Sequence, residues 1–182
     1  MAHAALLGES WRGAARGLED VAMLTLGTGV GGAAIVDGRL LKGHLGRAGH
    51  LGHMTVDFNG PPDDVLTPGS IELEMGNKTV HARSAGRFAS TRELVEAHLD
   101  GDVEATQLWT RSIRALAACI ASIANVLDPE ASVNALQNDP RNYTVLGFLD
   151  NKPRVTYLAR IRNPNPATAQ HDMAKFLWSN PT

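Results

Sequence analysis

The sequence predicts an α/β fold in which an antiparallel β-meander packs against helices. The short apolar runs 20-DVAMLTL-26 and 32-GAAIV-36 are typical of strands. The pair 37-DG-38, which precedes 39-RLL-41, is typical of a tight hairpin turn. Two later segments, 90–101 and 102–128, carry apolar residues at helical spacing. With 182 residues, of which 43% are hydrophobic, the chain has the size and composition of a single globular domain.

The charge balance argues against two classes of partner. The chain has 17 Lys and Arg residues against 19 Asp and Glu residues, so its formal net charge is -2. Such a chain lacks the positive field that attracts nucleic acid or an anionic membrane surface, and we expect neither partner. The single cysteine, Cys119, lies in the apolar run 115-ALAACIASIANVL-127, where we expect a buried thiol and therefore a protein of the reducing cytoplasm. We find no secretion signal and no run of about 18 apolar residues.

The first third of the chain is predicted to form a helix followed by the meander. Residues 2–16 are rich in alanine, with apolar positions at helical spacing and Gly17 as the C-cap. The runs 20–26, 32–36 and 39–41, together with 52-GHMTVDF-58, which alternates apolar and polar residues, give an antiparallel meander over residues 19–58. The segment 59-NGPPDDVLTPG-69 contains proline, glycine and aspartate and is predicted to be a loop.

Three helices are predicted after this loop. Residues 70–77 begin with Ser70 as the N-cap, and residues 90–101 begin at Ser90 or Thr91, with Glu93 completing a capping box. The long helix of residues 102–128 ends before Pro129 and is expected to present one apolar face to the core, made of Leu108, Ile113, Leu116, Ile120, Ile123 and Leu127. After residue 130 only 144-TVLGFL-149 and 154-RVTYLARI-161 read as strands.

The glycine-rich stretch 27-GTGVGG-32 is the first candidate for a functional site. Glycines after a strand can let several main-chain N–H groups converge on phosphate oxygens. A Rossmann turn should open a helix and a P-loop should contain Gly-Lys-Ser/Thr, whereas this stretch leads into another strand. The remaining readings are the strand–turn–strand by which sugar kinases and other actin-like ATPases hold nucleotide phosphates, or a tight turn between two packed strands.

The stretch 26-LGTGVGGAAIVDGRLLKGHLGRAGHLGH-53 resembles the signature of the ROK family (repressor, open reading frame, kinase), which includes bacterial glucokinases and amino-sugar kinases. The segments 2-AHAALLGE-9, 69-GSIE-72 and 125-NVLDPE-130 are also similar to family segments, so the resemblance covers residues 2–130. It implies an incomplete C-terminal lobe of the actin-like ATPase (ribonuclease H-like) fold over residues 1–130. Residues 131–182 are then expected to be an unrelated tail of uncertain fold.

The resemblance also implies site residues. The ATP phosphates, carried with Mg²⁺, would lie against the turn made by Gly27, Thr28, Gly29 and Gly31. The family's Ala-Gly-Glu-x-Gly-His supplies a Glu and a His to the sugar. Here 48-AGHLGH-53 places His50 at the Glu position and keeps His53, while Glu72 matches a second sugar-binding carboxylate. Each also has a structural alternative: the histidines can be satisfied structural groups, and Glu72 can complement a helix dipole.

Many family members hold a structural zinc ion with three cysteines and the histidine of that motif. This chain has 63-DDVL-66 and Ser70 in the corresponding region, and Cys119 lies far away in the sequence. We therefore predict no structural zinc and no other metal site, with Pro61, Pro62 and Pro68 stiffening the loop instead.

No catalytic residue is identified. The family's general base, an Asp, aligns with Met1, and the lobe that would precede it and the glycine-rich turn that would follow 125-NVLDPE-130 are not recognised. The leading hypothesis is an ATP-dependent hexose kinase by descent, inactive as this isolated chain, whose substrate is a hexose or amino sugar. One alternative is a non-catalytic sugar-binding or interaction module of the ROK repressor type, although no helix-turn-helix is recognised. Another is a decayed reading frame. Whether the chain forms a homo-oligomer is left open.

Overall fold

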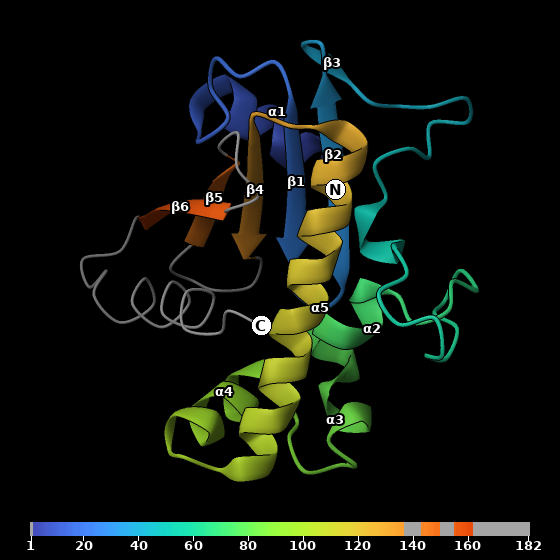
Figure 1. Cartoon of the computed structure of the whole chain (residues 1–182), viewed down its shortest axis with the longest axis vertical. Coiled ribbons are helices and arrows are strands. Elements are labelled where there is room, and N and C mark those ends of the chain that lie inside the picture. The colour runs from blue at the N-terminus through green and yellow to red at the C-terminus, as the bar shows by residue number, and fades with distance from the viewer. Residues whose placement is uncertain (1, 137–142, 150–154, 162–182) are drawn as a thin grey trace.

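The computed structural model describes residues 2–136, 143–149 and 155–161, which form one mixed sheet with helices on both faces (Figure 1). The six strands lie in the order β3-β2-β1-β4-β5-β6. Their bounds are β1 Val21–Leu26, β2 Val30–Val36, β3 Arg39–Leu40, β4 Ala131–Leu136, β5 Tyr143–Leu149 and β6 Val155–Ile161. The predicted α/β class is confirmed, and the two strand-like runs after residue 130 are strands.

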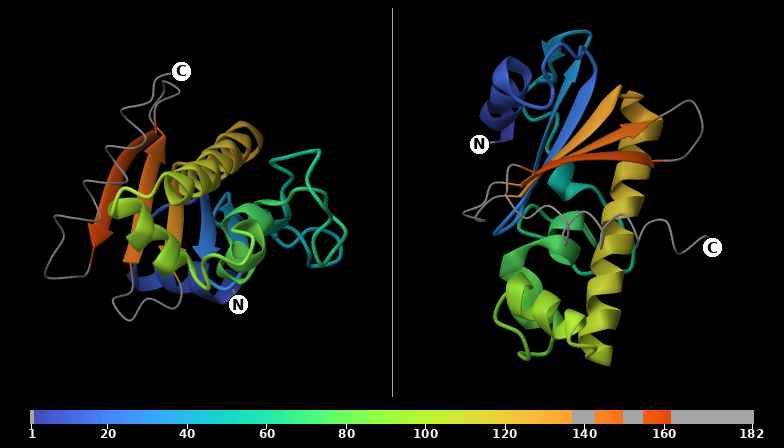
Figure 2. Two further views of the ribbon diagram at one scale, coloured as in Figure 1. Left: turned by 90° about the horizontal axis from the view of Figure 1, so that it is seen from below. Right: turned by 90° about the vertical axis from the view of Figure 1, so that its left-hand side faces the viewer.

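Helices α1 and α5 cover opposite faces of the sheet, as the right-hand view of Figure 2 shows. Because side chains alternate along a strand, β1 contributes side chains to the cores on both faces of the sheet. Val21 and Met23 pack with α1, whereas Ala22, Leu24 and Leu26 pack with α5. The α-helices are α1 Ala2–Arg12, α2 Ile71–Met75, α3 Val80–Arg83, α4 Thr91–Leu99 and α5 Val103–Leu127, with 3-10 turns η1 Leu51–His53 and η2 Asn77–Thr79.

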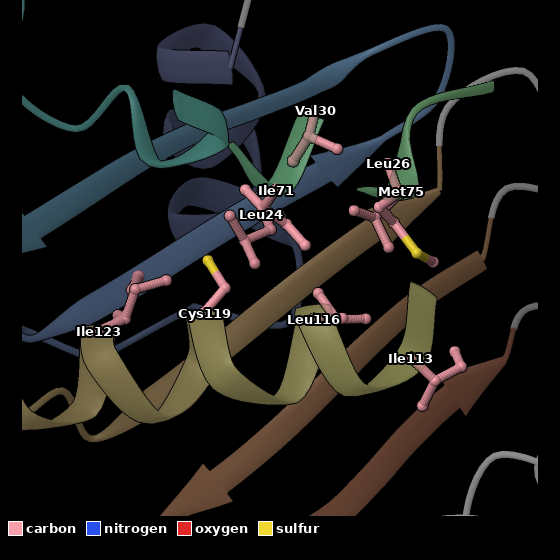
Figure 3. Packing of buried hydrophobic residues seen from close by; sticks show 10 residues of the cluster. Leu24, Leu26, Val30, Ile71, Met75, Ile113, Leu116, Cys119 and Ile123 are labelled. Atoms are coloured by element: carbon pink, nitrogen blue, oxygen red, sulfur yellow. The ribbon is translucent and has the colours of Figure 1, made fainter. Parts of the chain in front are cut away.

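Helix α5 supplies most of the larger core. Ile113, Leu116, Cys119 and Ile123 are buried on the face that meets β1 and α2 (Figure 3). The lower part of α5 extends beyond the sheet and packs on α4 through a separate small cluster. By length and composition alone α5 could cross a membrane. However, one face of α5 packs against the sheet, and the core helix of a soluble domain can have the same length and composition.

Helices α4 and α5 begin at side-chain caps, of which the one at Ser90 was predicted. Ser90 accepts a hydrogen bond from the N–H of Glu93 at the start of α4, and Asp102 accepts one from the N–H of Ala105 at the start of α5. Asp128, in the left-handed conformation with φ of 42°, ends α5 before Pro129. The prediction for the end of the first helix was wrong. Helix α1 ends at Arg12 rather than near Gly17, because the carboxylate of Glu9 accepts the N–H of Ala14 at 2.8 Å in place of a helical carbonyl.

Ser70 stands at the N-cap position of α2, but its hydroxyl makes no capping hydrogen bond. The N–H of Leu73 and that of Glu74 instead reach the main-chain oxygen of Ser70, at 3.0 and 3.4 Å. The helix is short, ending at Met75 rather than at residue 77.

The antiparallel meander is confirmed only as far as β3. Residues of β1 pair antiparallel with β2, and β2 with β3, with Val36 opposite Arg39. Asp37 and Gly38 both have positive φ, 50° and 68°, as a two-residue hairpin turn requires.

The predicted strand over residues 52–58 is wrong. This segment contains η1 and a single bridge between Thr55 and Ser70. Its polar main-chain groups pair with the loop that follows: the N–H of Val56 and that of Asp57 both reach the oxygen of Gly69, at 2.9 and 3.1 Å. The chain also lies so close to β2 that a Cβ at residue 52 would collide with the oxygen of Val30, so only glycine fits there.

The sheet is not purely antiparallel, because β4 pairs with β1 in parallel, from Val21 opposite Ala131 to Leu26 opposite Leu136. Helix α5 makes the crossover between them. The junction is fixed at its start, where Oε1 of Glu130 accepts the N–H of Glu19 at 2.9 Å and that of Asp20 at 3.1 Å. The boundary predicted after residue 130 therefore coincides with the first residue of a strand of the same sheet.

Candidate functional site

The glycine turn between β1 and β2 is held by the segment that follows α2. Within the turn, the N–H of Gly27 donates to the oxygen of Gly29 at 2.9 Å. The N–H of Asn77 donates to the oxygen of Gly27 at 2.9 Å, and the N–H of Lys78 donates to the oxygen of Thr28 at 2.8 Å. These three hydrogen bonds define the shape of the turn. Within the described residues, no hydrogen bond uses the N–H of Gly29.

Glu72 lies in the first turn of α2, with its carboxylate directed at this turn. Its Oε2 accepts the N–H of Val30 at 3.0 Å, and its Oε1 pairs with Nζ of Lys78 at 2.7 Å. A Cβ at residue 29 would collide with Oε2, so glycine is required for the carboxylate to come so close. The side chain is only 12% exposed. Glu72 thus joins α2 to the start of β2.

Lys78 completes this arrangement. Its Nζ contacts Oδ2 of Asp64 at 2.6 Å as well as Glu72. The hydrogen bonds to Asp64 and then to Glu72 raise the pKa of Lys78 above its usual range. The ammonium group therefore remains charged and balances the two carboxylates.

A cavity of about 400 Å³ opens beside the turn. Six of the seven residues predicted for the site line it: Thr28, Gly29, Gly31, His50, His53 and Glu72. Gly27 is not among the lining residues, and its N–H is already used inside the turn. The structure therefore brings the nucleotide and sugar candidates of the sequence to one cavity.

The cavity has a wall of imidazole rings. The ring of His50 lies 6.3 Å from that of His53 and 6.3 Å from that of His3, measured between centroids. His50 is exposed, whereas the other two are half-buried. Sequence reasoning did not assign His3, although it lies in the segment 2-AHAA-5 on which the resemblance partly rests. Its Nε2 is buried and has no hydrogen-bond partner among the described residues.

His53 is held from behind by Asp63. Nδ1 of the imidazole lies 2.8 Å from Oδ2 of Asp63, whose side chain is 1% exposed. Burial by itself would raise the pKa of Asp63, but the hydrogen bonds from His53 and the N–H groups of Thr67 and Val65 outweigh it and lower the pKa well below its usual range. The oxygen of Ser70 has no hydrogen-bond partner of normal geometry among the described residues, so we attribute the lowering to His53, Thr67 and Val65.

Sequence reasoning also missed Asp63 and Lys78. Asp63 was considered only as a residue of the loop where other family members place cysteines. A signal was available, because an Asp side chain can accept hydrogen bonds from main-chain N–H groups two and four residues later in the chain. Asp63 does so with Val65 and Thr67. Lys78 gave no signal, because its pairing depends on how η2 returns to the glycine turn.

The donor groups around His53 do not fit a zinc ion. Nδ1 is in direct contact with a carboxylate, the other carboxylate oxygen is occupied by two N–H groups, and Cys119 is buried in α5. Over residues 2–130, no cluster of three His, Cys, Asp or Glu side chains could hold a metal ion.

Chemically, the cavity can bind a polar ligand by hydrogen bonds to imidazole, hydroxyl and main-chain groups. A second hollow, of about 490 Å³, lies at Arg87, Asp102, Val103 and Glu104. Its charged groups are already paired, Arg87 with both acids, so it offers less for recognition.

The sequence is similar to those of known proteins. The sequence model of the ROK family matches residues 2–135. The chain is 36% identical over 146 residues to a glucokinase of Thermotoga maritima, covering 71% of this chain and 46% of that protein. It is 33% identical over 111 residues to an N-acetylmannosamine kinase of Vibrio cholerae, covering 60% of this chain and 39% of the relative.

A solved structure is similar in fold. The crystal structure of a ROK family glucokinase from Streptomyces griseus in complex with glucose and AMPPNP superposes with a TM-score of 0.62 at 27% identity, covering 74% of this chain and 50% of the other. The chain thus spans about half or less of the length of the relatives that it matches. Because the family match covers most of the chain, from the first helix into β4, this protein belongs to the ROK family.

Proposed function

We propose that this chain carries part of the binding site of a ROK sugar kinase, with a hexose or amino sugar in the cavity and the phosphates of ATP at the glycine turn. The observation that carries the proposal is the single cavity that joins the turn, the two motif histidines and Glu72. Relatives named as glucokinase and N-acetylmannosamine kinase support the substrate class. The lobe assignment within the actin-like fold, and the boundary after residue 130, belong to the same proposal.

The proposed roles follow from the chemistry of each group. The N–H of Gly29 and the hydroxyl of the exposed Thr28, two residues that line the cavity, are assigned to the phosphates as hydrogen-bond donors. Mg²⁺, bound with ATP, would neutralise phosphate charge. The imidazoles of His50 and His53 hydrogen-bond sugar hydroxyls. Glu72, with both oxygens already engaged, orients the turn and the sugar rather than removing a proton.

Turnover by this chain alone is proposed to be slow. General-base catalysis typically contributes a factor of about 100 to 10,000. Of the carboxylates around the cavity, Glu72 is paired with Lys78 and Asp63 is occupied by His53 and the loop N–H groups. Neither is available to take a proton from a sugar hydroxyl. Binding without efficient phosphoryl transfer is the behaviour that this geometry favours, and it also fits the alternative of a sugar-binding module. We propose a cytoplasmic protein with no nucleic-acid or membrane partner.

Calorimetric titration of the purified chain with glucose and with N-acetylmannosamine, alongside a coupled assay of ATP consumption, tests the proposal. We expect saturable binding of at least one sugar, and its loss in the His53→Ala variant. His44→Ala is the matched control, because His44 is exposed and lies outside the cavity. The proposed site would be contradicted if the chain bound neither sugar, or if both variants weakened sugar binding equally. Rapid ATP consumption dependent on sugar would contradict the proposed slow turnover.

A further inference from the structure

Asp63 is the most buried acid near the cavity, yet it does not line it. It lies in the loop between Thr55 and Ser70, on the far side of the His53 ring. Its side chain is 1% exposed, so its charge must be compensated by neighbouring protein groups. The neighbouring group that Asp63 can affect directly is the imidazole ring of His53.

The two oxygens of Asp63 have separate partners. Oδ1 accepts the N–H of Val65 at 3.0 Å and that of Thr67 at 2.9 Å. Oδ2 faces Nδ1 of His53 at 2.8 Å. The main-chain N–H of Asp63 also donates to the oxygen of Thr67 at 2.9 Å, which closes a turn inside the loop. The loop backbone therefore fixes the orientation of the carboxylate, and the carboxylate fixes the ring.

This geometry determines where the proton of His53 lies. An ionised carboxylate only accepts hydrogen bonds, so Nδ1 must carry the hydrogen. The neutral ring then leaves Nε2 without a hydrogen, as an acceptor, and no described residue hydrogen-bonds to it. Nε2 lies on the opposite edge of the ring from Asp63, and the ring lines the cavity.

We infer that Asp63 is a positioning residue that holds His53 in the Nδ1–H tautomer, so that Nε2 accepts a hydrogen bond from a hydroxyl of the ligand. The part that concerns the ligand rests on the proposed sugar site. The part that concerns the tautomer and the loop does not. The same carboxylate organises the 63–70 loop by direct hydrogen bonds, and this organisation requires no metal ion.

The decisive variant is Asp63→Asn, which keeps the shape and removes one acceptor. The two N–H groups of Val65 and Thr67 require the amide oxygen on their side, so the amide NH₂ group must face His53. A donor facing Nδ1 favours the ring with its hydrogen on Nε2. The variant is therefore expected to reverse the tautomer, which a loosened structure alone would not do.

The tautomer is read from the ¹⁵N shifts of the His53 ring, recorded without sugar at about pH 9, where an ordinary imidazole is neutral. We expect a protonated Nδ1 and an unprotonated Nε2 in the wild-type chain, and the reverse in Asp63→Asn. Asp100→Asn, the same change at an exposed residue outside the loop, should leave the shifts as in wild type. A wild-type ring with its hydrogen on Nε2, or an even mixture, overturns the inference even if the variant does not fold.

Sugar titration of the same proteins separates this inference from the proposed function. A reversed tautomer with sugar affinity reduced about 3- to 10-fold, the range for one lost neutral hydrogen bond, supports both. A reversed tautomer with no sugar binding by any of the proteins supports the role of Asp63 and contradicts the sugar site. Unchanged ring shifts in Asp63→Asn contradict the role of Asp63 whatever the affinity.

A separate measurement tests whether the 63–70 loop is organised without a metal ion. The melting temperature of the wild-type chain should be the same in excess metal chelator and in added zinc. A lower melting temperature in chelator would show that a metal ion, and not Asp63 alone, organises the loop.

Discussion

Glu72 accepts the main-chain N–H of Val30 at 3.0 Å across the Cα of Gly29, where no side chain could fit. The smallest side chain at residue 29 should therefore displace the carboxylate and break this bond. We expect Gly29→Ala to lower the free energy of unfolding by about 1.5–3 kcal/mol, the range for a hydrogen bond to a charged group. Urea titration measures the change.

A double-mutant cycle shows whether Glu72 causes that loss. In a Glu72→Ala background the carboxylate is absent, so Gly29→Ala should cost less by about 0.5–3 kcal/mol. Gly8→Ala, at a helical glycine with open space around it, is the control and should destabilise neither background. Additive effects of Gly29→Ala and Glu72→Ala would mean that the two residues do not compete for space.

Arg111 joins α5 to α2 through a two-pronged contact with Glu74, at 2.9 and 2.7 Å. Glu74 is 5% exposed, so Arg111→Ala would leave a buried carboxylate without its main partner. We expect a loss of about 1–3 kcal/mol in the free energy of unfolding, toward the lower end because water reaches the pair from the exposed Arg111 side. Arg114→Ala, at an exposed residue of the same helix that forms no ion pair within the described part of the chain, should change stability by less than about 0.5 kcal/mol. Equal losses would mean that the ion pair with Glu74 is not what makes Arg111 matter for stability.

Cys119 is fully buried, and burial raises the pKa of its thiol to about 11. Because the thiolate is the reactive form, the folded chain should react with a disulfide reagent at about pH 8 at least about 100-fold more slowly than the unfolded chain. Absorbance of the released thiolate follows the reaction, with the same protein in urea as the reference. Fast reaction of the folded chain would place Cys119 at an accessible surface.

Asp102 should make stability depend on pH in acid. The hydrogen bond from the N–H of Ala105, and then the one from Arg87, lower the pKa of Asp102. A lowered folded-state pKa stabilises the protein above the unfolded value of about 3.9, and this contribution is lost as the pH falls below it. Asp102→Ala should therefore melt a few degrees below wild type from pH 5 to pH 8, about the range where the carboxylate is ionised, and the gap should narrow below about pH 4. A gap that persists unchanged in acid would point to packing instead of charge.

The sequence predicted the elements that local chemistry determines. The Asp37–Gly38 turn, the cap at Ser90 and the buried face of α5 depend on neighbouring residues, and each was found where its pattern indicated. The alternation over residues 52–58 was misleading, because a strand also needs a partner, and the adjacent β3 has only two residues. The parallel pairing of β4 with β1 depends on how α5 crosses the sheet, and no local pattern encodes it.

In the candidate site, too, some residues could be predicted from the sequence and others could not. Six of the seven predicted residues line one cavity, because the glycine turn, the Ala-Gly-His-Leu-Gly-His stretch and Glu72 were recognised as parts of a known pattern. The groups that hold them were not recognised. Lys78 acts through partners that are distant in the sequence, so its identity alone gave no sign of its contacts. Asp63 has a local signal in its spacing from Val65 and Thr67, but its contact with His53 depends on the path of the loop.

The hydrogen bond between Glu130 and Asp20 joins residues 110 positions apart in the chain, and the central strand β1 completes its pairing only beside β4. The β1–β2 hairpin is local and can form early, whereas the β1–β4 contact must close a long loop. During synthesis, β1 would emerge with one edge open until residues 131–136 leave the ribosome. An open edge on a strand whose side chains are all buried invites pairing with other chains. Until β4 joins the sheet, this edge of β1 is therefore the part of the new chain most in need of protection from such pairing.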